Sequence, residues 1–106
     1  MNLQDGQVFK ATLITKGRKT SKPHAVELRA VYYNKTIFFS RRNPNSDWLK
    51  NAIATKDVTV EFFNESQAGR ASLVVDKDLE RKISRLKYSD KRSEESRVVI
   101  QVKLCE

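Results

Sequence analysis

The sequence predicts a mainly β protein, a six-stranded antiparallel barrel with two short helices, folded as a single domain over residues 1–106. Six segments are rich in β-branched and aromatic residues and carry apolar residues at alternate positions, which is typical of half-buried strands. Only two stretches show apolar residues at helical spacing. Six antiparallel strands in so short a chain favour a barrel, because closure leaves no exposed strand edge.

The first half of the chain predicts a meander of three strands. In the first strand, Phe9, Ala11 and Leu13 share one face, and the later strands alternate in the same way. A turn that contains Gly17 follows the first strand, and a tight reversal at Asn34 follows the second. The three strands are expected at residues 8–15, 24–33 and 36–40.

The second half predicts two helices and three further strands. A short helix is expected over about residues 45–55, where Trp48, Leu49 and Ala52 lie on one face. Asp76 is expected to cap a second helix whose apolar residues recur at Leu79, Ile83 and Leu86. The remaining strands are expected at residues 57–63, 67–75 and 97–104, with a polar linker over 88–95.

The positive charge of the chain is concentrated in one region. The chain carries a net charge of +8, and residues 16–42 hold eight basic residues against the single acid Glu27, a net charge of +7. Two of the basic groups are the hairpin loop that begins at Lys16 and the pair that begins at Arg41. The loop also offers glycine and hydroxyl groups, which suit a phosphate. The sequence therefore predicts a local site for a phosphate or another anion.

Several function classes lack the residues they need. The one histidine, His24, and the one cysteine, Cys105, supply neither a catalytic triad nor a three-ligand metal site, so no catalytic residue is assigned and no metal is expected. No apolar run is long enough to span a membrane, and the N-terminal residues do not resemble a secretory signal. The expected location is the cytoplasm.

Neighbouring aromatic residues predict an apolar outer surface. Pairs such as Tyr32-Tyr33, Phe38-Phe39 and Phe62-Phe63 point to opposite faces of a strand, so one ring of each pair leaves the barrel interior. An outward aromatic face favours a flat ligand or a second subunit, and the expectation is a homodimer.

The order of segments resembles the flavin- and deazaflavin-dependent oxidoreductases of the split β-barrel superfamily, which is pyridoxamine-phosphate-oxidase-like. The narrower resemblance, over residues 8–63, is to the deazaflavin-dependent nitroreductase family, with its pattern Thr-x-Gly-Arg-Lys-Ser/Thr-Gly-x-Pro-Arg-x-x-Pro-Leu. The matching residues are Thr15, Gly17, Arg18, Lys19, Thr20, Pro23 and Leu28. Ser21, His24 and Glu27 depart from it, where the family often has glycine, arginine and proline.

The resemblance implies a bound redox cofactor, either FMN or the deazaflavin coenzyme. It implies hydride transfer from the reduced cofactor to a small nitro, quinone or enone-like acceptor, with the protein supplying position and electrostatics. In the family the hairpin loop and the segment before the first helix hold the cofactor phosphate, and the helix supports that segment. The residues carried over as cofactor-binding are Lys16, Arg18, Lys19, Thr20, Ser40, Arg41, Trp48 and Asn51.

Two alternatives stay open at this point. A nucleic-acid-binding small barrel would use the same basic residues and exposed aromatics, although the acids of the second half interrupt any continuous basic groove. A cofactor carrier without turnover would share the binding residues of the enzyme. The sequence leaves open the choice between FMN and deazaflavin, the acceptor, and the roles of His24, Tyr88 and Cys105.

Overall fold

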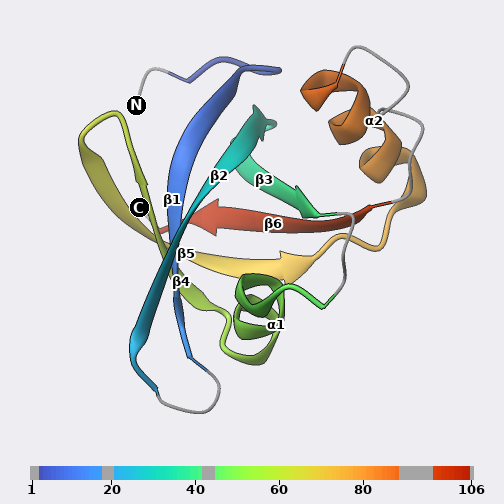
Figure 1. Cartoon of the computed structure of the whole chain (residues 1–106). Coiled ribbons are helices and arrows are strands. Elements are labelled where there is room, and N and C mark those ends of the chain that lie inside the picture. The colour runs from blue at the N-terminus through green and yellow to red at the C-terminus, as the bar shows by residue number, and fades with distance from the viewer. Residues whose placement is uncertain (1–2, 18–20, 42–44, 89–96, 106) are drawn as a thin grey trace.

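The computed structural model describes residues 3–17, 21–41, 45–88 and 97–105, and these form a closed antiparallel barrel of six strands with two helices (Figure 1). Around the barrel the strands follow the order β1-β2-β3-β6-β5-β4, which confirms the predicted fold class. The elements are β1 (Val8–Lys16), β2 (Pro23–Tyr33), β3 (Thr36–Arg41), α1 (Asp47–Ala54), β4 (Asp57–Phe62), β5 (Glu65–Leu73), α2 (Lys77–Lys87) and β6 (Val98–Leu104).

The barrel interior is filled by the alternating apolar residues that the sequence indicated. In β1, Phe9, Ala11 and Leu13 are buried while Lys10 between them is exposed. Leu13 pairs with Val26 of β2 on one side and with a valine of β4 on the other, so one layer of apolar side chains runs across three strands. The two-residue side-chain period of a strand therefore decides which residues face the core.

Helix α1 packs at the end of the barrel where the β1–β2 hairpin turns (Figure 1). Its Trp48, Leu49 and Ala52 belong to the barrel core cluster, as the helical spacing of these residues predicted. The helix occupies Asp47–Ala54, slightly shorter than the expected 45–55.

Helix α2 covers the outer face of the barrel over β2, β3 and β6 (Figure 1). Asp76 caps the helix as expected, because its carboxylate accepts from the backbone N–H groups of Asp78 and Leu79. Ile83 packs with Phe38 and other outward residues of the strands in a second apolar cluster. The outward ring of Phe38 is thus covered by this chain's own helix, which corrects the expectation that a ligand or a second subunit covers it.

The β4–β5 turn is tighter than expected and leaves one aromatic ring exposed. Phe63 and Asn64 both adopt left-handed backbone conformations, with φ of 48° and 63°, so the chain reverses in two residues. Strand β5 therefore starts at Glu65 rather than near Gln67. The ring of Phe63 is 57% exposed, so it alone of the three outward rings in the predicted pairs is largely open to solvent.

Among the described residues, none of the helices combines the length and the apolar character that a membrane crossing requires.

Candidate functional site

The predicted site residues Lys16, Ser40 and Arg41 lie at two separate places beside β2, and the other two that the structure describes, Trp48 and Asn51, lie on α1. Lys16 is the last residue of β1 and pairs with Pro23, the first residue of β2. Ser40 follows Phe39, which pairs with Ala30, so the register sets Ser40 beside Arg29 near the middle of β2. Six residues of strand, about 20 Å, separate these two positions along β2. The predicted residues Arg18, Lys19 and Thr20 lie outside the described part of the chain.

A hollow of about 440 Å³ lies beside Lys16, at the hairpin end of the barrel. Apolar residues from β1, β2, β4 and β5 line much of it, and Ser21 and Asp57 are among its polar lining residues. Its lining residues are Ile14, Thr15, Lys16, Ser21, Pro23, Asp57, Val58, Thr59, Ala68, Gly69 and Cys105. The size and the apolar lining suit the flat ring of a small ligand.

The two predicted residues of α1 connect both places to the core. The Asn51 side chain is buried and donates from Nδ2 to Oγ1 of Thr15 at 3.4 Å, next to Lys16. The Thr15 hydroxyl donates in turn to the carbonyl of His24 at 3.4 Å. The buried Trp48 ring stands edge-on to Phe39, with centroids 6.4 Å apart, one residue before Ser40. Trp48 and Asn51 therefore position both places from within the core.

Ser40 lies beneath a lysine that the sequence analysis did not select. Lys87, at the last turn of α2, donates from Nζ to the Ser40 Oγ at 3.1 Å and to the Ser40 carbonyl at 3.4 Å. The lysine is only 7% exposed. Four neighbours join this pair in what we name the Lys87 cluster, which consists of Arg29, Ser40, Arg41, Lys87, Tyr88 and Arg97.

The electrostatics of the Lys87 cluster are strongly positive. Burial, followed by the charges of Arg97, Arg29 and Arg41, lowers the pKa of Lys87 from 10.5 to about 8. The Tyr88 ring lies among the cations, with its centroid 4.3 Å from Arg97, 5.5 Å from Lys87 and 5.9 Å from Arg29. Cation–π attraction to this ring offsets part of the repulsion between the cations.

The sequence indicates that Lys87 is unusual, but it does not indicate which residues surround Lys87 in the fold. Lys87 lies four residues after Ile83, so it falls on the apolar stripe of α2, where an ordinary surface lysine does not belong. Arg29 was part of the basic region, although no role was assigned to it. Arg97 is 56 residues from Arg41 along the chain, and only the pairing of β3 with β6 brings the two together.

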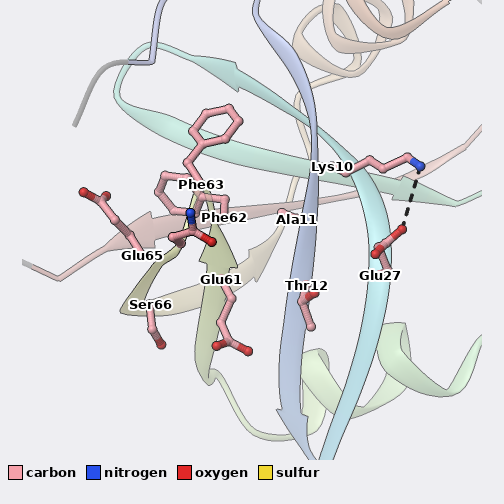
Figure 2. Close-up of a pocket in the computed structure, with 10 residues that line it drawn as sticks. Lys10, Ala11, Thr12, Glu27, Glu61, Phe62, Phe63, Glu65 and Ser66 are labelled. Carbon is pink, nitrogen blue, oxygen red and sulfur yellow. Dashed lines mark ion pairs between the residues drawn. The ribbon is translucent and has the colours of Figure 1, made fainter.

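A second hollow, also of about 440 Å³, has the opposite character and lies on the outer face of β1 and β4 (Figure 2). Three carboxylates line it, from Glu27, Glu61 and Glu65, beside the exposed ring of Phe63. Lys10 faces Glu27 there in an exposed ion pair of 3.9 Å. The net negative charge of this hollow disfavours a phosphate, so an anionic ligand would be favoured at Lys16 or at the Lys87 cluster instead.

The described residues hold no group of three or more histidine, cysteine, aspartate and glutamate side chains able to bind a metal ion. His24 is exposed on β2, and it is its backbone carbonyl that takes part in the hydrogen bond to Thr15. Cys105 is exposed beside the hairpin-end hollow.

Comparison with known proteins gives a likeness of fold. No protein-family model and no curated protein matches the sequence. Among solved structures, a proposed 5-nitroimidazole antibiotic resistance protein from Bacteroides thetaiotaomicron has a TM-score of 0.70 at 12% identity, covering 95% of this chain and 75% of its own. A proposed pyridoxamine 5′-phosphate oxidase from Listeria innocua has a TM-score of 0.69 at 17% identity, covering 92% of this chain and 84% of its own.

Other similar structures carry different functional names. An FAD-binding protein from Mesorhizobium loti has a TM-score of 0.68 at 15% identity, covering 92% of this chain and 79% of its own. A heme storage protein from Vibrio cholerae has a TM-score of 0.73 at 13% identity, covering 92% of this chain and 82% of its own. At these identities the likeness shows a shared barrel fold and no more, and it leaves the ligand to be argued from the residues.

Proposed function

We propose that this chain binds a flavin-type cofactor, FMN or the deazaflavin coenzyme, and uses it as an oxidoreductase. The observation that carries the proposal is the apolar hollow beside Lys16, which joins a place for a flat ring to the basic hairpin. The fold supports it, because similar structures include a protein named as FAD-binding and one named as a pyridoxamine 5′-phosphate oxidase.

The cofactor ring would lie against the apolar side chains of the hollow, where Ile14 and Val58 exclude water from one of its faces. Lys16, together with Arg18, Lys19 and Thr20 of the same hairpin, would bind the polar arm of the cofactor. Cations, a hydroxyl and backbone N–H groups on a glycine-containing loop are donors that match phosphate oxygens. The donor set of the hairpin therefore fits the proposed group.

The cofactor supplies hydride transfer when it is bound, and the chain's own residues supply position. Asn51 and Thr15 hold the base of the hairpin against α1, so the residues that flank the hollow rest on a buried hydrogen bond. Trp48 holds the end of β3 in the same way through Phe39. Ser40 and Arg41 are the last residues of β3 and lie beside the middle of β2, where they would contact the far end of an extended cofactor or the small acceptor that the cofactor reduces.

A binding experiment tests the cofactor. The purified protein is titrated with FMN, with riboflavin and with the deazaflavin coenzyme, and ring fluorescence is followed at two salt concentrations. We expect saturable binding of one phosphorylated cofactor at one site per chain. Absence of binding by both FMN and the deazaflavin coenzyme contradicts the proposal, and oligonucleotide binding that falls steeply with salt would support a nucleic-acid-binding barrel instead.

A matched pair of variants locates the cofactor. Lys16→Met should weaken binding of the phosphorylated cofactor about tenfold, since a charge-assisted hydrogen bond contributes roughly 1.5–3 kcal/mol. Lys82→Met removes an exposed lysine on α2 and serves as the control. Equal affinities of the two variants would place the cofactor elsewhere on the barrel. Oxidation of the pre-reduced complex by a nitro or quinone compound then separates an enzyme from a cofactor carrier.

A further inference from the structure

Lys87 places a charge where α2 otherwise packs against the barrel by apolar contacts. Lys87 lies on the apolar stripe of α2, next to residues that pack against Phe38 and Val99, where a methionine or leucine would bury as much surface without a charge. Burying an ammonium beside guanidinium groups opposes folding, because each charge loses water and repels the others. A side chain that costs stability in this way is a candidate for a binding role.

Cations from different elements gather around Lys87, and Arg41 acts on it from the end of β3, where its Nε donates to the Ser46 Oγ at 3.1 Å. Arg29 comes from β2, Arg41 from the end of β3, Lys87 from the last turn of α2 and Arg97 from the residue before β6. Among the described residues, every charged group found to act on the pKa of Lys87 is a cation. Elements that are distant in the sequence have therefore been brought together with charges of one sign.

The chemistry of the cluster is that of an oxyanion site. Arginine presents a planar fork of N–H donors that matches two oxygens of a phosphate, and lysine adds a compact charge. Lys87 uses two of its donor directions on Ser40, which fixes the position of its ammonium group. Arg29 is exposed, so a small anion can reach its guanidinium group from solvent.

We propose that the Lys87 cluster is a phosphate-binding site, in which Lys87 and the surrounding arginines hold the phosphate group of a small molecule about 20 Å along β2 from the Lys16 position. The phosphate belongs either to the cofactor, in which case the hairpin at Lys16 binds another polar group of the cofactor, or to the molecule that the cofactor reduces. The site itself stands on its own residues, and only the assignment of its phosphate to one of these two sources rests on the proposed function.

Binding at this site is expected to depend on pH with a defined sign. Among the described residues, the groups found to act on or contact Lys87 are the Ser40 hydroxyl, the Tyr88 ring and the three arginines of the cluster. Lys87 therefore sets the pH dependence of phosphate affinity, because it releases its proton in the free protein above about pH 8. A bound phosphate retains that proton, so affinity should fall by up to about tenfold per pH unit above pH 8.

The first test uses inorganic phosphate and needs no cofactor. Calorimetric titrations at pH 7, with ionic strength held constant by sodium chloride, compare the natural protein with Lys87→Met and Lys82→Met. We expect saturable phosphate binding that Lys87→Met weakens at least tenfold and Lys82→Met leaves unchanged. No phosphate binding, or equal binding by all three proteins, overturns the proposal.

An amide NMR titration of the unaltered protein provides a readout that does not depend on a variant folding correctly. Phosphate should move the signals of Ser40, Lys87 and Tyr88 in one saturable process, and the movement should weaken at pH 9.5. Shifts confined to the hairpin around Lys16 would overturn the assignment of the phosphate to the Lys87 cluster.

A competition experiment distinguishes the two sources of phosphate. If the cluster holds the cofactor phosphate, inorganic phosphate competes with FMN, and Lys87→Met abolishes the preference for FMN over riboflavin. If it holds the phosphate of the reduced molecule, FMN and inorganic phosphate bind together and Lys87→Met leaves FMN affinity unchanged. Failure of FMN to bind at all contradicts the proposed function while leaving the calorimetric result on phosphate intact.

Discussion

Replacement of Lys87 by methionine should make the protein more stable at neutral pH, because the lysine is buried with its charge. Methionine keeps an unbranched side chain of similar length on the apolar stripe of α2 and removes the ammonium group. The lowering of the Lys87 pKa from 10.5 to about 8 corresponds to roughly 3 kcal/mol of unfolding free energy lost at pH 7. Loss of the hydrogen bonds to Ser40 costs about 1–2 kcal/mol, so we expect Lys87→Met to be about 1–2 kcal/mol more stable.

The pH dependence of the unfolding free energy tests this prediction more strictly than its value at pH 7. Between pH 8 and 10.5 the unfolded chain still holds the Lys87 proton that the folded chain has released, so unfolding takes up a proton and becomes less favourable as the pH rises. The penalty on the natural protein is thus complete below pH 8 and declines towards pH 10.5. About 2 kcal/mol of it is recovered between pH 7 and 9.5.

Urea unfolding at pH 7 and at pH 9.5 measures both quantities. The stability advantage of Lys87→Met over the natural protein should fall by about 2 kcal/mol over this interval, so that at pH 9.5 the natural protein is as stable as the variant or more stable. Lys82→Met provides the reference, because Lys82 is exposed and its replacement should give a difference that is the same at both pH values. A Lys87→Met protein that is less stable at pH 7 by a margin independent of pH would show that Lys87 is a structural residue and would refute this reasoning.

Three further substitutions test other parts of the structure. Asn51→Ala removes the buried hydrogen bond to Thr15, so it should lower the unfolding free energy by about 1–3 kcal/mol and weaken cofactor binding. Urea unfolding measures the first effect and FMN titration the second. A variant with the stability and the FMN affinity of the natural protein would contradict the positioning role of Asn51. Gly69→Ala sets a Cβ 2.7 Å from Val102 Cγ1 and 3.0 Å from a backbone carbonyl, so the unfolding free energy should fall by about 1–3 kcal/mol. Thermal melting measures this loss of stability. An unchanged melting temperature would count against the close approach of β5 and β6. Lys35 has a left-handed backbone conformation, φ 61°, in an exposed turn, and Lys35→Gly should remove this strain and stabilise the protein by about 0.5–1 kcal/mol. A destabilised variant in the same melting assay would show that the lysine side chain contributes more stability than its backbone strain costs.

Much of the fold followed from local patterns. Alternation in β1 and β2 predicted which residues face the core, and the structure buries Phe9, Ala11 and Leu13 on that face. The cap at Asp76 and the helical spacing after it predicted α2 correctly. Such patterns are local because the period of a strand or a helix is set by the backbone itself.

The patterns did not predict what would cover the outer face of the sheet. The alternation correctly directed Phe38 outward, but the partner that buries it is α2, which is joined to the barrel through β5 and β6. The tight reversal at Phe63 and Asn64 was also missed, because bulky residues seldom adopt left-handed conformations and none of the usual glycine is present there.

For the candidate site, the sequence by itself determined that positive charge gathers in residues 16–42 and that a glycine-containing basic hairpin precedes β2. The tertiary structure alone decided that Lys16 and Ser40 lie about 20 Å apart along β2 and that Ser40 bonds to Lys87, whose pKa the charge of Arg97 lowers. Charge composition is a property of the chain, whereas the proximity of residues 40, 87 and 97 depends on strand register and on the packing of α2, which no single segment encodes.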